Sequence, residues 1–215
     1  MSDGHLLKIK NVSFRRDQRL IFKGVDLALD GGEALHLLGP NGCGKTTLIR
    51  VITTLLNPSA GHIYYFDKDV SEVRYQYLSE LLYIGHKSAV KPWLSIEENL
   101  VWMAASEGIR DRDKVLAALR SIGLSGFNER LCHQLSAGQI RRVALARLML
   151  TKRRIWVLDE PFSTLDSEGT FCITNCLQEH LDREGAIFVT SHQDIDLSCI
   201  KRYDLSQRCP HYVSN

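Results

Sequence analysis

The chain has 215 residues, of which 44% are hydrophobic and 24% are charged, and its formal net charge is +2. This apolar content is enough to bury a core as one domain, or as one domain with a small subdomain. The nearly neutral charge argues against a nucleic-acid partner and against a disordered acidic chain. We expect no signal peptide, and no apolar run approaches the roughly 20 residues that cross a bilayer.

The cysteines favour reduced thiols in an intracellular protein. Six of them are scattered along the chain, and none forms a CxxC pair. Cys172 and Cys176 could share a helix face and suit a metal ion. Without a histidine or a second pair nearby, two inert thiols are the better interpretation.

Hydrophobic patterning in the first half predicts strands over residues 6–14 and 24–39, with turns at Asp17-Gln18 and around residues 30–32. A helix is expected over residues 44–56, ended by Asn57-Pro58. Two further strands are expected over residues 61–66 and 80–85.

The middle of the chain is expected to be helical. Ser95 and Glu98 form the pattern of a capping box at the start of a helix over 94–108, and an amphipathic helix follows over 111–124. Strand, helix, strand and a last short strand are then expected, over residues 154–160, 171–185, 186–191 and 202–206. This alternation predicts an α/β fold with a largely parallel sheet.

The stretch "GPNGCGKTT" lies between a predicted strand and a predicted helix and matches the phosphate-binding P-loop pattern. Its glycines let backbone amides surround a polyphosphate, and the helix start adds its positive dipole end. Lys45 can reach the outer phosphates, the Thr46 hydroxyl can ligate Mg²⁺, and Thr47 can support the phosphates. An ordinary glycine-rich turn would not need the lysine and the hydroxyl. The predicted ATP-binding residues of this loop are Gly39, Pro40, Asn41, Gly42, Cys43, Gly44, Lys45, Thr46 and Thr47.

Two carboxylates follow the apolar run "IWVL", which is typical of a buried strand. Asp159 and Glu160 should therefore emerge at the carboxyl edge of the sheet, where open α/β sheets bind ligands. Asp159 is expected to hold Mg²⁺ together with Thr46, and Glu160 to take a proton from the attacking water. The alternative, that both only cap the next helix, is disfavoured by the P-loop.

The stretch "LSAGQIRRVALARLML" carries the strongest family signal. Ser136 suits an N-cap, and Ala137-Gly138 leave the helix start open to an anion. Here the sequence resembles the ABC ATPases, whose "LSGGQ" signature is present as "LSAGQ". The resemblance covers nearly the whole chain, in the family's order of motifs. The matching signature residues are Leu135, Ser136, Ala137, Gly138 and Gln139.

The resemblance implies a P-loop NTPase fold of the ABC type, with a mixed-sheet core, an N-terminal antiparallel β region and a helical subdomain. The core would span about 1–87 and 133–215, and the subdomain about 88–132. ATP would lie between the P-loop of one subunit and the signature of another in a head-to-tail dimer. The stretch "STLD", which ends in Asp166, is similar to the family's dimer-contact loop. His192 is similar to the family's histidine that touches the γ-phosphate and orders the attacking water.

Two positions depart from the usual ABC pattern. The family stacks adenine on an aromatic residue near the N-terminus, and here either Arg16 or Phe14 could take that place. At the junction of core and helical subdomain, His86 occupies the position of a glutamine that links ATP to the membrane partner. This "GH", with the short tail, resembles the ATP-binding subunits of cytochrome c maturation (haem export) systems.

That resemblance implies membrane-embedded subunits as partners, at the cytoplasmic face of the bacterial inner membrane, with the chain bound peripherally. ATP hydrolysis would drive haem delivery or the release of a haem-loaded chaperone. No direct haem site is expected, since CxxCH is absent and chance explains "RCPHY" (Arg208–Tyr212) better. An ABC transporter for a lipid, a lipoprotein or a drug is the alternative. A soluble ABC ATPase is disfavoured, because there is no long coiled coil and only one ATPase domain.

Overall fold

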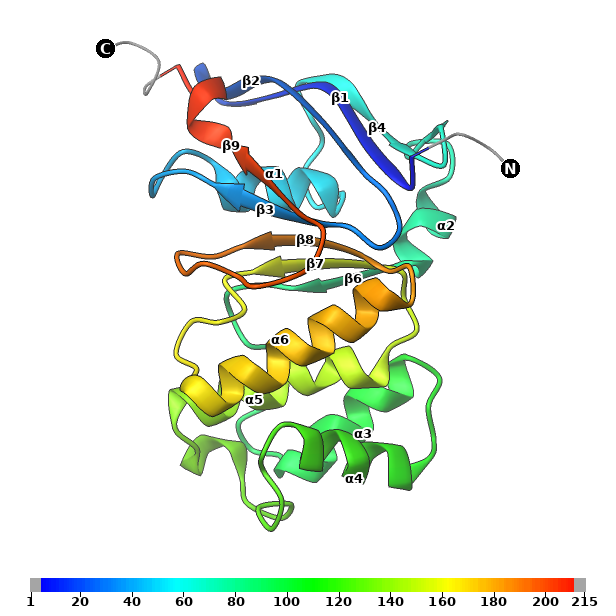
Figure 1. Cartoon of the computed structure of the whole chain (residues 1–215), viewed down its shortest axis with the longest axis vertical. Coiled ribbons are helices and arrows are strands. Elements are labelled where there is room, and N and C mark those ends of the chain that lie inside the picture. The colour runs from blue at the N-terminus through cyan, green and yellow to red at the C-terminus, as the bar shows by residue number, and fades with distance from the viewer. Residues whose placement is uncertain (1–4, 211–215) are drawn as a thin grey trace.

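Two β-sheets form the framework of the molecule (Figure 1). The computed structural model describes residues 5–210. The central sheet has the strand order β6-β7-β8-β3-β9, and every neighbouring pair in it is parallel. Its strands are β3 (Ala34–Leu38), β6 (Leu81–Ile84), β7 (Ile155–Asp159), β8 (Ala186–Thr190) and β9 (Ile200–Asp204).

The second sheet is antiparallel and has the order β2-β1-β4-β5. A tight turn joins its first two strands, and Asp17 there has a φ of 55°, a left-handed conformation that aspartate tolerates. The parallel and antiparallel strands that the sequence predicts are thus divided between two sheets. The antiparallel strands are β1 (Leu7–Arg16), β2 (Arg19–Leu29), β4 (Ala60–Tyr65) and β5 (Lys68–Asp69).

Helices cover both faces of the parallel sheet (Figure 1). The α-helices are α1 (Lys45–Ile52), α2 (Arg74–Ser79), α3 (Ile96–Ser106), α4 (Arg112–Ser121), α5 (Ala137–Leu145) and α6 (Ser167–Asp182). The 3₁₀ segments are Cys132–Gln134, Ala146–Leu150 and Leu205–Arg208. Within the described residues, no helix combines the length and the apolar character that crossing a bilayer requires.

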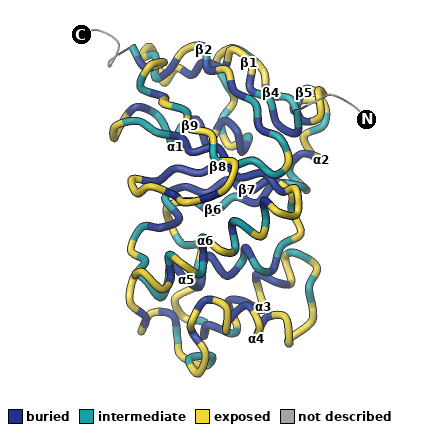
Figure 2. The backbone as a smooth tube through the Cα atoms, in the orientation of Figure 1, coloured by how far each residue is buried: buried dark blue, intermediate teal, exposed yellow. Residues whose placement is uncertain are grey.

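Side chains of the parallel strands alternate between two apolar clusters. Val157 and Phe188 pack with α1 and the antiparallel sheet. Trp156, Leu158 and Ile187 point to the opposite face and pack with α6. Because both faces are covered, β7 and β8 are buried at every position, which Figure 2 shows as the dark centre of the molecule.

A third apolar cluster belongs to the helical part of the chain. It joins α3 and α4, and it also takes in Val143, Ala146 and Leu150 from α5 and the 3₁₀ segment after it. The signature helix therefore packs against this part. The boundaries of about 88–132 for the subdomain stay a prediction.

Local capping decides where several helices begin and end. The capping box of α3 is confirmed, with Ser95 Oγ accepting from the Glu98 amide at 3.1 Å and Glu98 Oε2 accepting from the Ser95 amide at 2.7 Å. α1 ends at Ile52, earlier than expected, because Thr54 has a left-handed φ of 55° and the Leu55 amide donates back to the Arg50 carbonyl at 2.8 Å. The short helix α2 was not predicted.

A buried ion cluster joins the end of α3 to the segment that enters β7. Glu107 has a side chain only 5% exposed and accepts hydrogen bonds of 2.9 Å from both Arg147 and Arg153. Burial alone would raise the pKa of Glu107, but the hydrogen bonds from the two arginines outweigh it, and the pKa lies below its ordinary value.

We predict that Glu107→Gln lowers the free energy of unfolding at pH 7 by about 2 kcal/mol, because hydrogen bonds to a buried charge are lost. A lowered native pKa stabilises the fold above the unfolded-state value near 4, and this contribution disappears as the pH falls. Denaturant titrations should therefore show the two proteins converging below about pH 4. Exposed Glu72→Gln is the control, and an equal difference at pH 7 and pH 3.5 would contradict the assignment.

Candidate active site

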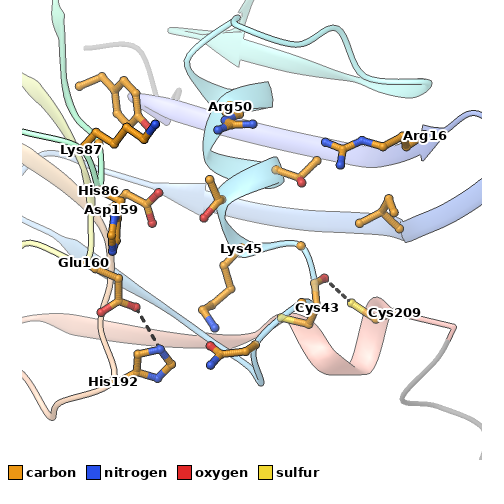
Figure 3. A pocket seen from close by; sticks show the side chains of 18 of the residues that line it. Arg16, Cys43, Lys45, Arg50, His86, Lys87, Asp159, Glu160, His192 and Cys209 are labelled. Atoms are coloured by element: carbon orange, nitrogen blue, oxygen red, sulfur yellow. Dashed lines mark hydrogen bonds and ion pairs between the residues drawn. The ribbon is translucent and has the colours of Figure 1, made fainter. Parts of the chain in front are cut away.

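Four parallel strands end at one edge of the central sheet, and the loops that follow them surround a cavity of about 1000 Å³. The P-loop follows β3, Gly85 and His86 follow β6, and Asp159 and Glu160 stand at the end of β7. His192 follows β8. Figure 3 shows Lys45 on the α1 side of this cavity, facing the wall that carries Glu160 and His192. Motifs up to 153 residues apart in the sequence, from Gly39 to His192, thus belong to one site.

The P-loop has a backbone conformation that needs glycine. Gly39, Gly42 and Gly44 have φ angles of 136°, 83° and 104°, in the region where a side chain is strained. A Cβ on Gly44 would lie 2.8 Å from Ile21 Cγ2, so β2 lies close beneath the loop. No side chain caps α1 at Gly44. The amides at this helix start are therefore suited to an anion.

Lys45 Nζ donates to the carbonyl oxygens of Gly39 at 2.6 Å and Pro40 at 3.3 Å. These two residues hold the lysine and do not line the cavity. The other predicted loop residues do line it: Asn41, Gly42, Cys43, Gly44, Lys45, Thr46 and Thr47.

A buried threonine organises the acidic pair. Asp159 is 3% exposed, and its Oδ1 accepts from the Thr190 hydroxyl at 2.9 Å. The same hydroxyl oxygen accepts from the Glu160 amide at 3.0 Å. Asp159 Oδ2 is buried and has no hydrogen-bond partner among residues 5–210. That oxygen is available for a ligand in the cavity.

Glu160 has a φ of 53°, a left-handed conformation that costs energy in a residue other than glycine. Its side chain is 17% exposed, and Oε1 lies 3.6 Å from His192 Nε2 (Figure 3). This distance is an ion-pair contact when the histidine is protonated and is too long for a hydrogen bond. The carboxylate and the imidazole therefore face the same space.

The structure separates the two candidates for the adenine contact. Phe14 is 8% exposed and packs 6.2 Å from Phe22 between ring centroids, so it belongs to the core. Arg16 lines the cavity. Arg50 and Lys87 also line it and add positive charge that the sequence had not indicated.

The signature residues lie elsewhere. None of the residues from Leu135 to Gln139 lines the cavity. Ser136 caps α5 in a second capping box, with Gln139 as its partner. A Cβ on Gly138 would lie 2.7 Å from the Thr164 carbonyl oxygen, so the helix start is packed tightly against the loop before α6.

Asp166 caps α6 by accepting from the Gly169 amide at 2.9 Å, and it also pairs with Arg142. The Arg142 hydrogen bond, followed by that of the Gly169 amide, lowers the pKa of the Asp166 carboxyl. This cap explains why α6 begins at Ser167 and not at Phe171 as expected.

Two buried residues that hold the backbone of the site were also missed, Thr190 and Arg141. Thr190 is a hydroxyl at the end of a fully apolar strand, and it is itself 0% exposed. Arg141 is 2% exposed and shares a face of α5 with Leu145, which packs in the core. A charged residue on the apolar face of a helix was the available signal.

The cysteines and the "RCPHY" stretch are the remaining candidates from the sequence. Among residues 5–210 no group of three or more histidines, cysteines or acidic residues could hold a metal ion. The Cys209 thiol donates to the Cys43 carbonyl oxygen at 2.8 Å and is buried. His211 of "RCPHY" lies outside the described residues.

A family model described as ABC transporter matches residues 22–163, well over half of the chain. The chain belongs to the ABC transporter family. As such it is an ATP-binding protein that hydrolyses ATP in the service of transport. The P-loop NTPase fold of the ABC type, expected from the sequence, is confirmed by this match and by solved structures.

Several curated ABC proteins are similar along most of their length. The cytochrome c biogenesis ATP-binding export protein CcmA of Pseudomonas putida is 42% identical over 190 residues, 88% of this chain and 90% of that protein. CcmA of Escherichia coli O157:H7 is 39% identical over 206 residues, 94% of this chain and 97% of that protein. The expected resemblance to this group is confirmed.

Solved ABC structures have the same fold. A putative ABC transporter ATP-binding protein from Pyrococcus furiosus superposes with a TM-score of 0.82 at 25% identity, over 94% of this chain and 98% of that one. A dimeric ATP-binding cassette with ADP and Pi reaches a TM-score of 0.75 at 24% identity, over 87% and 88% of the two chains.

We predict that Lys45→Ala weakens nucleotide binding by about 10–100-fold, the loss expected for one charge-assisted contact to phosphate. Isothermal titration of the purified chain with ATP measures the effect. Lys114→Ala, at an exposed lysine on α4, is the control. Unchanged ATP affinity in the Lys45 variant would contradict the assignment of the loop.

Proposed function

We propose that this chain is the ATP-hydrolysing subunit of an ABC transporter that serves c-type cytochrome biogenesis. The observation that carries the proposal is the single cavity that holds the P-loop, Asp159, Glu160, His86 and His192 together. The 42% identity to a cytochrome c biogenesis ATP-binding export protein supports the biological setting.

In this proposal the P-loop amides and Lys45 bind the phosphates of ATP. Mg²⁺ fits beside them, because Asp159 Oδ2 is a buried carboxylate oxygen without a partner and the Thr46 hydroxyl lines the same cavity. Few protein ligands are needed, since Mg²⁺ keeps several waters and binds the nucleotide phosphates. When bound, the ion would neutralise charge on those phosphates. Arg16 lies where its planar guanidinium could stack on the base.

Hydrolysis requires a water molecule to attack the γ-phosphorus, with ADP leaving along the line of attack. Glu160 is the proposed acceptor of the water's proton, and its strained backbone holds the carboxylate toward the cavity. His192, 3.6 Å from that carboxylate, is proposed to orient the water and to contact the γ-phosphate. Both are the proposed catalytic residues.

The signature residues are proposed to act on the nucleotide of a second copy. Leu135 to Gln139 lie outside the cavity of their own chain, and Ser136 and Ala137 are exposed at the start of α5. A head-to-tail dimer with two-fold symmetry would place each helix start opposite a P-loop and create two composite sites. Asp166 would lie near that interface.

Transmembrane subunits are the proposed further partners, with the chain bound peripherally at the cytoplasmic face of the bacterial inner membrane. His86 is the proposed link to them, since it lines the cavity and is exposed. The loop after it carries Trp93, and the following helix α3 carries Trp102; they are 76% and 49% exposed and offer apolar contacts. Haem, as cargo or on a chaperone, is the proposed object of the transport step.

We predict that Glu160→Gln lowers ATP turnover by about 10²–10⁴-fold while ATP binding remains, because only the proton acceptor is lost. Phosphate release and ATP titration separate the two effects. In a host lacking its own copy of this subunit, the variant should fail to restore haem-stained c-type cytochromes. Glu72→Gln is the exposed control. Normal turnover in the Glu160 variant would refute the assigned role, and normal cytochromes in a host without the subunit would refute the biological setting.

Two matched capping boxes test the signature. Ser136→Ala and Ser95→Ala each remove one N-cap and should each cost about 1 kcal/mol of stability. Only Ser136→Ala should also weaken ATP-dependent dimerisation, measured by light scattering in the Glu160→Gln background. Equal dimerisation in the two serine variants would leave Ser136 with a capping role alone.

A further inference from the structure

Arg141 is the least exposed charged side chain near the cavity, at 2%, and every acceptor of its hydrogen bonds is a main-chain carbonyl oxygen. Its Nη2 donates to Asp159 at 3.0 Å and Glu160 at 2.9 Å, and its Nη1 donates to Gly85 at 2.9 Å. Its Nε donates to Pro161 at 3.2 Å. The guanidinium thus joins the ends of β6 and β7.

Packing alone does not account for an arginine here. Leu145, one turn further along the same face of α5, packs in the apolar cluster under α6. An apolar residue at position 141 would extend that contact without burying a charge. What a guanidinium adds is a rigid fork of five donors, which can serve several carbonyl oxygens from two strands at once.

The carbonyl oxygens that accept from Arg141 belong to residues at the ends of β6 and β7, where the loops of the proposed catalytic site begin. Glu160 is held on both of its backbone sides, since its amide donates to Thr190 Oγ1 and its carbonyl oxygen accepts from Arg141 and Ser163. These contacts fix a residue with a left-handed φ of 53°. The His86 carbonyl oxygen lies 3.5 Å from Arg141 Nη1, at the limit of a hydrogen bond.

Arg141 also belongs to the signature helix. Ser136 caps α5, and Arg141 lies five positions further on, about 8 Å along the helix. A helix of this length moves as one body. We propose that Arg141 is a positioning residue that ties the signature helix to Glu160 and to the His86 loop, so that closure of the dimer on the signature sets the geometry of the proton acceptor. This inference rests on the proposed catalytic role of Glu160.

The test is Arg141→Lys in the full-length chain assembled with its membrane subunits. Lysine keeps the buried charge but offers one point of donation, so it cannot bridge the two strand ends. Turnover should fall about 10–100-fold, as expected for a displaced catalytic group, while the dissociation constant for ATP stays within about 2-fold. Arg153→Lys is the matched control, because Arg153 donates to the carbonyl oxygens of Leu78 in α2 and of Leu81 at the opposite end of β6. Its turnover per folded molecule should be unchanged.

A double-mutant comparison separates positioning from general damage. If Arg141 acts through Glu160, adding Arg141→Lys to Glu160→Gln should not reduce the residual turnover further. A further loss equal to that of the single variant would overturn the inference, as would wild-type turnover of Arg141→Lys while Glu160→Gln is inactive. An active Glu160→Gln protein would instead refute the proposed function. Should the lysine variant fail to fold by thermal melting, Arg141→Gln provides the same comparison without a buried charge.

Discussion

The parallel central sheet is the constraint on which the rest of the molecule depends. Its strands are paired so that Leu37 lies opposite Thr190, and Leu158 lies opposite both Ile84 and Val189. Neighbouring strands are about 4.8 Å apart, so the loops that follow them must converge. A P-loop, an acidic pair and two histidines are brought together by this register, and none of them needs to be near the others in the sequence.

At the edges of the sheet the hydrogen-bond ladder ends, and side chains take over its unpaired backbone groups. At the carboxyl edge, Thr190 and Arg141 fulfil that role, and at the amino edge Arg153 does so for β6. Arg153 is in turn held by Glu107 at the end of α3. The helical part is therefore joined to the core at both ends of β6, through arginines from α5 and from the segment before β7.

The sequence was most informative where structure is set locally. The glycine spacing of the P-loop, the capping box of α3 and the apolar run before Asp159 depend on neighbours within a few residues. The sequence was least informative where contacts with residues far along the chain determine the position of a side chain. The register of β1 against β2 shifts on both sides of Phe14, and this irregularity, which no residue pattern shows, places Phe14 in the core and Arg16 at the cavity. The family resemblance implies a dimer loop at Asp166, whereas its contact as the cap of α6 was found in the structure.

A cysteine in the wall of the cavity has a practical consequence for handling the protein. Cys209, only six residues before the last one, lines the cavity and holds the P-loop backbone at Cys43 (Figure 3). Substitution or chemical modification of this thiol would therefore remove a hydrogen bond from the P-loop backbone. Cys209 is accordingly a position to leave unchanged when cysteines are replaced for site-specific labelling.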